Sequence, residues 1–292
     1  MRKYVLAVSG GVDSMVLLHA LHAKSLIAGV DPWKLLKQGE LIVAHFDHGI
    51  RPDSADDAAF VVATAEDLGI PVYTKREELG ANASEEHARD RRYRFLKSIA
   101  VQYDARIVTA HHEGDIGETI AINLTRGTGW RGVAVLDAPD IDRPLLSLSK
   151  QEIVSYATVN NVQWHEDSTN SNTRYLRNAL RQKLSAHQDI LRQLAALRSQ
   201  QIQLKQLIEQ EIVALDLGDL EISRYFLSHC GDPVAIEILR AICLRYGSSG
   251  LTIPQRQRLL HSIKVAKQGT TINAGDGVNI RFSRTGFVVV KA

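Results

Sequence analysis

Cysteine is scarce in this chain, and long apolar runs are absent. The 292 residues include only two cysteines, Cys230 and Cys243, which are too far apart for a C-x-x-C pair. This count argues against a structural zinc site, an iron–sulfur cluster and a disulfide framework, so we expect both to be small buried hydrophobic side chains. No uncharged apolar stretch is long enough to span a bilayer, and Met1-Arg2-Lys3 leads directly into a predicted strand. We therefore expect no membrane span, no signal peptide and a cytoplasmic protein.

Acidic residues are missing from one long basic stretch, although the net charge of the whole chain is only +2. Residues 240–267 contain six Lys and Arg side chains and no acid, and residues 174–198 contain six against the single acid Asp189. This segregation indicates positive faces suited to a polyanion. Ordinary solvated helix faces explain the charge pattern equally well, so charge alone does not decide.

Strand-like and helix-like segments alternate through the first half of the chain. Such alternation predicts a parallel sheet with helices on both faces, and ligands bind beyond the carboxyl ends of its strands. Polar residues that follow successive strands should therefore converge. Apolar periodicity predicts a long helix over 189–215, and the pattern then changes to short helices and a final strand pair. A short strand near 162–164 is expected to close the sheet edge. The predicted strands are 4–8, 40–45, 71–74 and 105–110, and the predicted helices include 54–68 and 84–103.

The predicted fold class is α/β, a Rossmann-like parallel sheet with a long linker helix and a small α+β C-terminal domain. We predict a first domain over residues 1–186, a linker helix over 187–215 and a small C-terminal domain over 216–292.

A glycine turn lies between the first strand and the first helix. Its residues are Ser9, Gly10, Gly11, Val12, Asp13 and Ser14. Glycines let main-chain N–H groups approach an anion, and the helix N-terminus adds its positive dipole end. No lysine follows the glycines, so this is not a Walker A loop, and the third glycine of the dinucleotide fingerprint is missing. The turn predicts a phosphate cradle, with an ordinary strand-to-helix turn as the alternative.

Two further polar segments follow predicted strands. His45, Asp47, His48 and Arg51 lie after the second strand and could orient a nucleotide and its magnesium; a solvated turn is the alternative. After the fourth strand come His111 and His112, then Asp115 and Glu118, which share one helix face. Two carboxylates beside a triphosphate suit Mg²⁺. The alternative for these acids is a capping role at the helix N-terminus.

Three arginine-containing segments are candidates for binding phosphate or nucleic acid. Arg126 and Gly127 belong to a glycine-punctuated loop that could close over phosphates or simply connect two elements. The helix with Arg89 and Arg92 combines basic and aromatic side chains, which suits RNA, although a solvated face is nearly as good an explanation. The segment 164–170 contains Glu166, Asp167 and Asn170, and a basic helix with Arg177 and Arg181 follows it. Its acids could bind a cationic substrate and its arginines a phosphate backbone.

Together these motifs resemble the tRNA(Ile)-lysidine synthetases over roughly the first two thirds of the chain. The Ser9–Ser14 run is common to all PP-loop ATPases, whereas the segment 166–170 with Arg177 is similar to the lysidine synthetases in particular. The family usually has an acid or amide where this chain has Gly114, and its small-residue pattern is altered at Val133–Val135. The C-terminal region is similar to the family's tRNA-binding appendage only in size and general pattern.

The resemblance implies a two-step ligation. ATP would adenylate the C2 oxygen of the wobble cytidine in tRNA(Ile) with a CAU anticodon, releasing pyrophosphate, and free L-lysine would then displace AMP. It implies ATP and Mg²⁺ as cofactors and leaves open a monomer or a homodimer. The implied catalytic residues are Asp13, Asp47, Asp115 and Glu118, with Asp115 and Glu118 holding Mg²⁺. The implied ATP-binding residues are Ser9–Ser14, His45, Arg126 and Gly127, and the implied substrate-binding residues are Arg89, Arg92, His111, Glu166, Asp167, Asn170, Arg177 and Arg181.

Two alternatives remain open. Another PP-loop tRNA-modifying enzyme is possible, although a thiolation enzyme needs catalytic cysteines and neither cysteine lies in the predicted nucleotide domain. A non-catalytic tRNA-binding protein on the same fold is the second. The presence of Asp13, Asp47, Asp115 and Glu118 argues against that alternative.

Overall fold

The computed structural model describes residues 2–49, 54–80, 83–166, 176–215, 221–248 and 251–291. The chain forms two compact units, Met1–Gln200 and Gln201–Ala292, with the boundary inside a long helix. That helix runs from Gln188 to Ala214, close to the predicted 189–215. The role of this helix as a linker between functional domains stays a prediction.

The first unit is built on a parallel sheet of five strands in the order β3-β2-β1-β4-β5. Every neighbouring pair in this sheet runs parallel, as the alternating sequence pattern predicts. Their carboxyl ends therefore share one edge, to which the polar segments are attached. The strands are β1 (Arg2–Ala7), β2 (Gly39–Asp47), β3 (Val72–Arg76), β4 (Ala105–Val108) and β5 (Ile141–Asp142).

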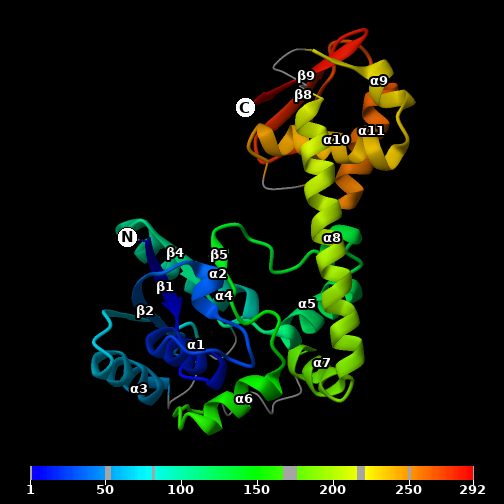
Figure 1. Ribbon diagram of the computed structural model, residues 1–292. Coiled ribbons are helices and arrows are strands. Elements are labelled where there is room, and N and C mark those ends of the chain that lie inside the picture. Colours follow the sequence, from blue (N-terminus) through cyan, green and yellow to red (C-terminus); the bar gives the residue numbers. More distant parts are fainter. Residues whose placement is uncertain are drawn as a thin grey trace. The chain divides into compact units, whose positions relative to one another are not determined.

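Helices cover both faces of this sheet (Figure 1). On one face, Tyr4, Leu6 and Val43 pack with helices α1, α3 and α6 in the largest apolar cluster. On the other face, Val5 and Ile107 pack against α4. The helices of this unit up to residue 160 are α1 (Val12–Ala23), α2 (Pro32–Leu36), α3 (Ser54–Asp67), α4 (Glu85–Tyr103), α5 (Glu113–Thr125) and α6 (Lys150–Val159).

The predicted edge strand near residues 162–164 is wrong, because the sheet ends instead at the two-residue strand β5. Ile141 and Asp142 pair in register with Ile107 and Val108 of β4. The amide of Val162 instead bonds the Ala157 carbonyl at the end of α6, and its side chain is buried in the cluster on the α1 face. A buried apolar side chain after a helix therefore mimics the pattern of a strand.

A layer of helices completes the first unit. Helix α7 (Leu176–Ser185) packs against α5, and the first part of α8 (Gln188–Ala214) contributes Leu194 to an apolar cluster with Ile116 and Ile120 of α5. A short 3₁₀ turn, Trp130–Gly132, precedes this cluster's Val133 and Val135. This layer fixes the N-terminus of α5, and with it the second polar segment.

The second unit has its own antiparallel sheet in the order β6-β9-β8-β7. Its core joins these strands to three helices and includes Cys243, whose thiol pKa burial raises to about 11. Cys243 is thus the buried hydrophobe that we expected, and Cys230 is partly buried. Over the part of the chain that the structure describes, no helix is long and apolar enough to cross a membrane. The elements are β6 (Ile222–Ser223), α9 (Arg224–His229), α10 (Asp232–Arg245), α11 (Ile253–Val265), β7 (Thr271–Gly275), β8 (Val278–Phe282) and β9 (Gly286–Lys291).

Candidate active site

The glycine turn follows β1 at the carboxyl edge of the sheet and opens α1. Gly10 has φ +90°, a conformation that side chains other than glycine rarely adopt. Gly11 is the N-cap of α1, and no described side chain caps it. The first N–H groups of this helix therefore lack the side-chain acceptor that an N-cap usually supplies, and they suit an anion. Ser14 instead donates its hydroxyl to the Gly11 carbonyl at 2.9 Å, which fixes the turn.

Two distant residues reach the glycine turn. The Lys150 ammonium, at the start of α6, lies 2.6 Å from a carboxylate oxygen of Asp13. The amide of His165 donates to the Gly10 carbonyl at 3.0 Å. Its imidazole stacks on Phe60 and bonds the Asp57 carboxylate at 2.8 Å. The chain that leads into the acidic segment 166–170 is thus attached to the glycine turn.

His45 and Asp47, at the end of β2, are both buried. The Nδ1 atom of His45 lies 2.9 Å from the Val8 carbonyl, so the imidazole ties β2 to the end of β1. Burial opposes ionisation of Asp47, but a backbone N–H, the Ser54 hydroxyl and the Arg76 guanidinium at 2.6 Å together lower its pKa. Asp47 is therefore an ionised, paired carboxylate in this structure.

His112 and Asp115 form a reciprocal capping box at the N-terminus of α5. The Nδ1 atom of His112 accepts the Gly114 N–H at 3.0 Å, and Asp115 accepts the His112 N–H at 2.9 Å. A Cβ at position 114 would lie 2.7 Å from the His112 ring, so glycine leaves room for this cap. Burial raises the pKa of Asp115, but His112, whose backbone N–H it accepts, and Arg181 outweigh this effect, and the net shift is downward.

Glu118 is nearly inaccessible to solvent, with 2% of its surface exposed. Arg181 of α7 binds both its carboxylate oxygens, Nε at 2.6 Å and Nη2 at 3.0 Å. These hydrogen bonds raise the pKa of Arg181. Among the described residues, no group of three His, Cys, Asp or Glu side chains could hold a metal ion. With Glu118 bound to a guanidinium, Asp115 is the better placed of the two predicted magnesium ligands, and the magnesium assignment stays a prediction.

Arginines gather on the α4 side of the same edge. The guanidiniums of Arg89 and Arg92 lie 4.8 and 5.5 Å from the centre of the Tyr93 ring. Burial lowers the pKa of Arg92, and Arg89 and Arg177 lower it further. Burial also lowers the pKa of His111 to about 3, and Arg92 adds to this shift. His111 is therefore a neutral imidazole beside several cations.

The remaining predicted residues do not all join this edge. Arg126 and Gly127 follow the C-terminus of α5, roughly 20 Å from its N-terminus at 1.5 Å per residue. Glu166 is exposed, and Asp167 and Asn170 lie outside the described residues. The catalytic roles of Asp13, Asp47, Asp115 and Glu118 stay predictions.

Comparison with known proteins places this chain in a family. A model of the PP-loop domain, an ATP-binding family, matches residues 1–188. The chain belongs to the PP-loop family. A curated tRNA(Ile)-lysidine synthase of Rickettsia bellii is 33% identical over 235 residues, which are 76% of this chain and 52% of that protein. The synthase of Thermus thermophilus is 40% identical over 185 residues, 61% of this chain and 34% of that protein. This PP-loop chain thus spans about half the length, or less, of the curated relatives it matches.

Among solved structures, the U34-tRNA thiolase NcsA of Methanococcus maripaludis, described with its [4Fe-4S] cluster, matches with a TM-score of 0.52 at 17% identity. The match covers 70% of this chain and 71% of that one. At this identity the likeness shows the fold alone, and it agrees with the predicted Rossmann-like sheet.

Sequence reasoning missed three residues at the edge of the PP-loop sheet. Lys150 supplies the cation that the glycine turn lacks in sequence, from a helix start that the capping box of Ser149 and Glu152 already marked. His165 lies inside a motif in which the neighbouring acids carry the sequence signal. Arg143 follows β5, and a two-residue strand leaves too short a pattern to identify it.

Proposed function

We propose that this PP-loop chain carries the catalytic centre of an ATP-dependent ligase that attaches lysine to C2 of the wobble cytidine in tRNA(Ile) with a CAU anticodon. The observation that carries the proposal is the pairing, at one sheet edge, of an anion cradle with a separate cluster of arginines. One substrate with phosphates suits the cradle, and an RNA backbone suits the cluster. The curated relatives named tRNA(Ile)-lysidine synthase support this choice of reaction.

In the first step, the cytidine C2 oxygen attacks the α-phosphate of ATP and pyrophosphate leaves. The N–H groups at the start of α1 would stabilise the charge that develops on the leaving pyrophosphate. Lys150 lies within an ion-pair distance of Asp13 and could exchange this carboxylate for a phosphate oxygen. Bound Mg²⁺ would neutralise further phosphate charge, with Asp115 as its protein ligand.

In the second step, the ε-amine of lysine displaces AMP from C2, so the amine must first lose a proton. Among Asp47, Asp115 and Glu118, Asp115 has the most accessible side chain, 14% exposed against 4% for Asp47 and 2% for Glu118. Its lowered pKa keeps it ionised at neutral pH, so it can hold the lysine ammonium close to the reacting carbon. We assign Asp115 the binding of the lysine ammonium, whose proton passes to solvent before the amine attacks C2, because a carboxylate with a lowered pKa is too weak a base to keep it; Asp47 and Glu118 each hold an arginine.

A tRNA thiolation enzyme on the same fold is the second candidate that the sequence leaves open, and its chemistry needs reactive cysteines. The chain offers two cysteines, both in the second unit, and Cys243 is buried with a raised thiol pKa. A buried thiol with a raised pKa is a poor nucleophile and metal ligand. The chemistry of the cysteines therefore favours ligation.

The proposal is tested by following AMP and pyrophosphate release from ATP with purified protein. AMP release should require both lysine and a CAU-anticodon tRNA(Ile), whereas pyrophosphate release in a single turnover should require the tRNA and not lysine. Asp13→Asn should abolish pyrophosphate release and change tRNA binding less than twofold. AMP release that is independent of lysine would refute the ligase and leave another PP-loop modification.

A further inference from the structure

Arg143 lies directly after β5, at the same sheet edge as His111. Its Nη1 donates to the Leu136 and Ile141 carbonyls at 3.0 and 3.1 Å, so the backbone holds the guanidinium in place. Its Nε atom is buried and has no hydrogen-bond partner among the described residues. Arg143 also lies among the charges that lower the pKa of His111. It is therefore a fixed cation whose buried Nε donor is unsatisfied among the described residues.

Arg92 resembles Arg143 in having a buried Nε donor that is unsatisfied over the described ranges. Its Nε atom is also buried without a partner in the described part of the chain, and Arg89 lies beside it across Tyr93. Arg89 lowers the pKa of both Arg92 and Arg143, and Tyr93 raises the pKa of both, so the two guanidiniums share the same neighbours. Burying like charges together with unsatisfied donors is unfavourable unless an anion offsets them.

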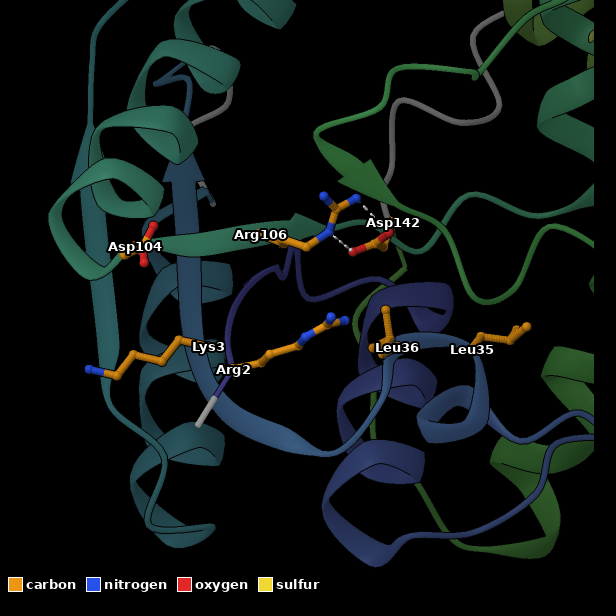
Figure 2. Close-up of a pocket in the computed structure, with 7 residues that line it drawn as sticks. All are labelled: Arg2, Lys3, Leu35, Leu36, Asp104, Arg106 and Asp142. Atoms are coloured by element: carbon orange, nitrogen blue, oxygen red, sulfur yellow. Dashed lines mark hydrogen bonds and ion pairs between the residues drawn. The ribbon is translucent and has the colours of Figure 1, made fainter. Parts of the chain in front are cut away.

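The carboxylates near Arg143 have other partners. Asp140 lies 3.5 Å from Lys97 of α4, and Asp115 caps α5. Arg106 provides the contrast, because its guanidinium binds both carboxylate oxygens of Asp142 (Figure 2). It also donates to the Pro139 carbonyl. Arg143 is next to Asp142 in the sequence and Arg106 is 36 residues away from it, yet the structure pairs Asp142 with Arg106. Within the described residues, no carboxylate forms an ion pair with Arg89, Arg92 or Arg143.

We propose that Arg143 completes a phosphate-binding site with Arg89 and Arg92, in which one phosphate group receives the free Nε donors of Arg92 and Arg143. A phosphate presents several acceptor oxygens and matches the forked guanidinium donors better than a single carboxylate does. The phosphate belongs either to the RNA backbone or to ATP. The assignment of the bound phosphate to an RNA backbone rests on the proposed function, whereas the existence of a phosphate-binding site does not.

The test uses the full chain and two probes in the absence of lysine, so that no turnover is needed. The probes are inorganic pyrophosphate and an RNA hairpin with a CAU loop, each titrated against wild type and Arg143→Gln. The variant should bind the relevant probe about 10- to 100-fold more weakly, the range expected for a lost charge-assisted contact. For RNA, the slope of log affinity against log salt should also fall by about 0.7.

Two further variants separate binding from folding. Arg94→Gln removes the same charge from an exposed position of α4 and should change either affinity less than twofold. Arg143→Lys retains the charge without the fork, so it should keep the salt slope and lose part of the affinity. Loss for pyrophosphate alone assigns the site to the nucleotide, and loss for RNA alone assigns it to the backbone. Equal affinities of Arg143→Gln and Arg94→Gln for both probes would overturn the phosphate site, whatever the fate of the ligase proposal.

Discussion

Replacing Arg181 by methionine should destabilise the first unit strongly, because it leaves the Glu118 carboxylate buried without its partner. Glu118 has 2% of its side chain exposed and Arg181 has 39%, so the pair lies between a buried and a surface ion pair. Breaking a buried pair costs about 3–5 kcal/mol and an exposed pair contributes about 0–1 kcal/mol. We expect a loss of about 3 kcal/mol in the free energy of unfolding.

The assay is urea unfolding followed by tryptophan fluorescence. The three tryptophans are Trp33, Trp130 and Trp164, all in the first unit, so the signal reports on the unit that contains the pair. With a slope of about 2 kcal/mol per molar urea, Arg181→Met should lower the midpoint by about 1.5 M. Lys183→Met changes an exposed cation on the same helix and should shift the midpoint by less than about 0.3 M.

The double variant Glu118→Gln, Arg181→Met decides whether the two side chains are coupled. Removing both charges should recover about 2 kcal/mol relative to the sum of the single variants. Additive losses, or a loss in Arg181→Met no larger than that of Lys183→Met, would refute the ion pair. Glu118 would then be available as the magnesium ligand that the resemblance implies.

Three further outcomes are expected. Because burial lowers the folded pKa of His111 to about 3 from 6.5, the unfolded state binds more protons between these pH values. Wild type should therefore lose up to about 2 kcal/mol relative to His111→Gln between pH 7 and pH 5 in urea unfolding, and parallel pH profiles would contradict this. Lys150→Met should weaken ATP binding about tenfold in a nucleotide titration, and an unchanged affinity would leave Lys150 a purely structural ion pair. His165→Ala removes the contacts with Phe60 and Asp57 and should lower the unfolding free energy by about 1–2 kcal/mol, whereas a neutral effect would show that the backbone bond to Gly10 suffices.

The sequence predicted the parts of the fold that rest on local patterns. The parallel sheet follows from the alternation of strand-like and helix-like segments, and the long helix α8 follows from its apolar periodicity. The short strand β5 has only two residues, so its pattern carried too little information, and Val162 took its place in the prediction. Which segment forms the edge strand is decided by its pairing with β4, and the sequence pattern alone does not show that pairing.

In the candidate site, too, the sequence predicted local features and missed contacts between residues that are far apart in the chain. The glycine turn was identified because glycine requirements and the helix start are local features. The partners of its acids come from far along the chain: Lys150 is 137 residues from Asp13, and Arg181 is 63 residues from Glu118. No spacing rule pairs such residues, so Glu118 was predicted as a metal ligand and Arg181 as a substrate-binding residue. Their contact appears only in the folded chain.

The activity proposed for this PP-loop chain joins lysine to a tRNA cytidine with ATP. The most direct measurement is mass spectrometry of nucleosides from CAU-anticodon tRNA(Ile) after incubation with the protein, ATP and isotopically labelled lysine. We expect a cytidine heavier by one lysine residue that carries the label and is absent with Asp13→Asn. A thiolated nucleoside, or unmodified cytidine in every sample while a lysidine synthase of a curated relative is active beside it, would contradict the proposed ligation.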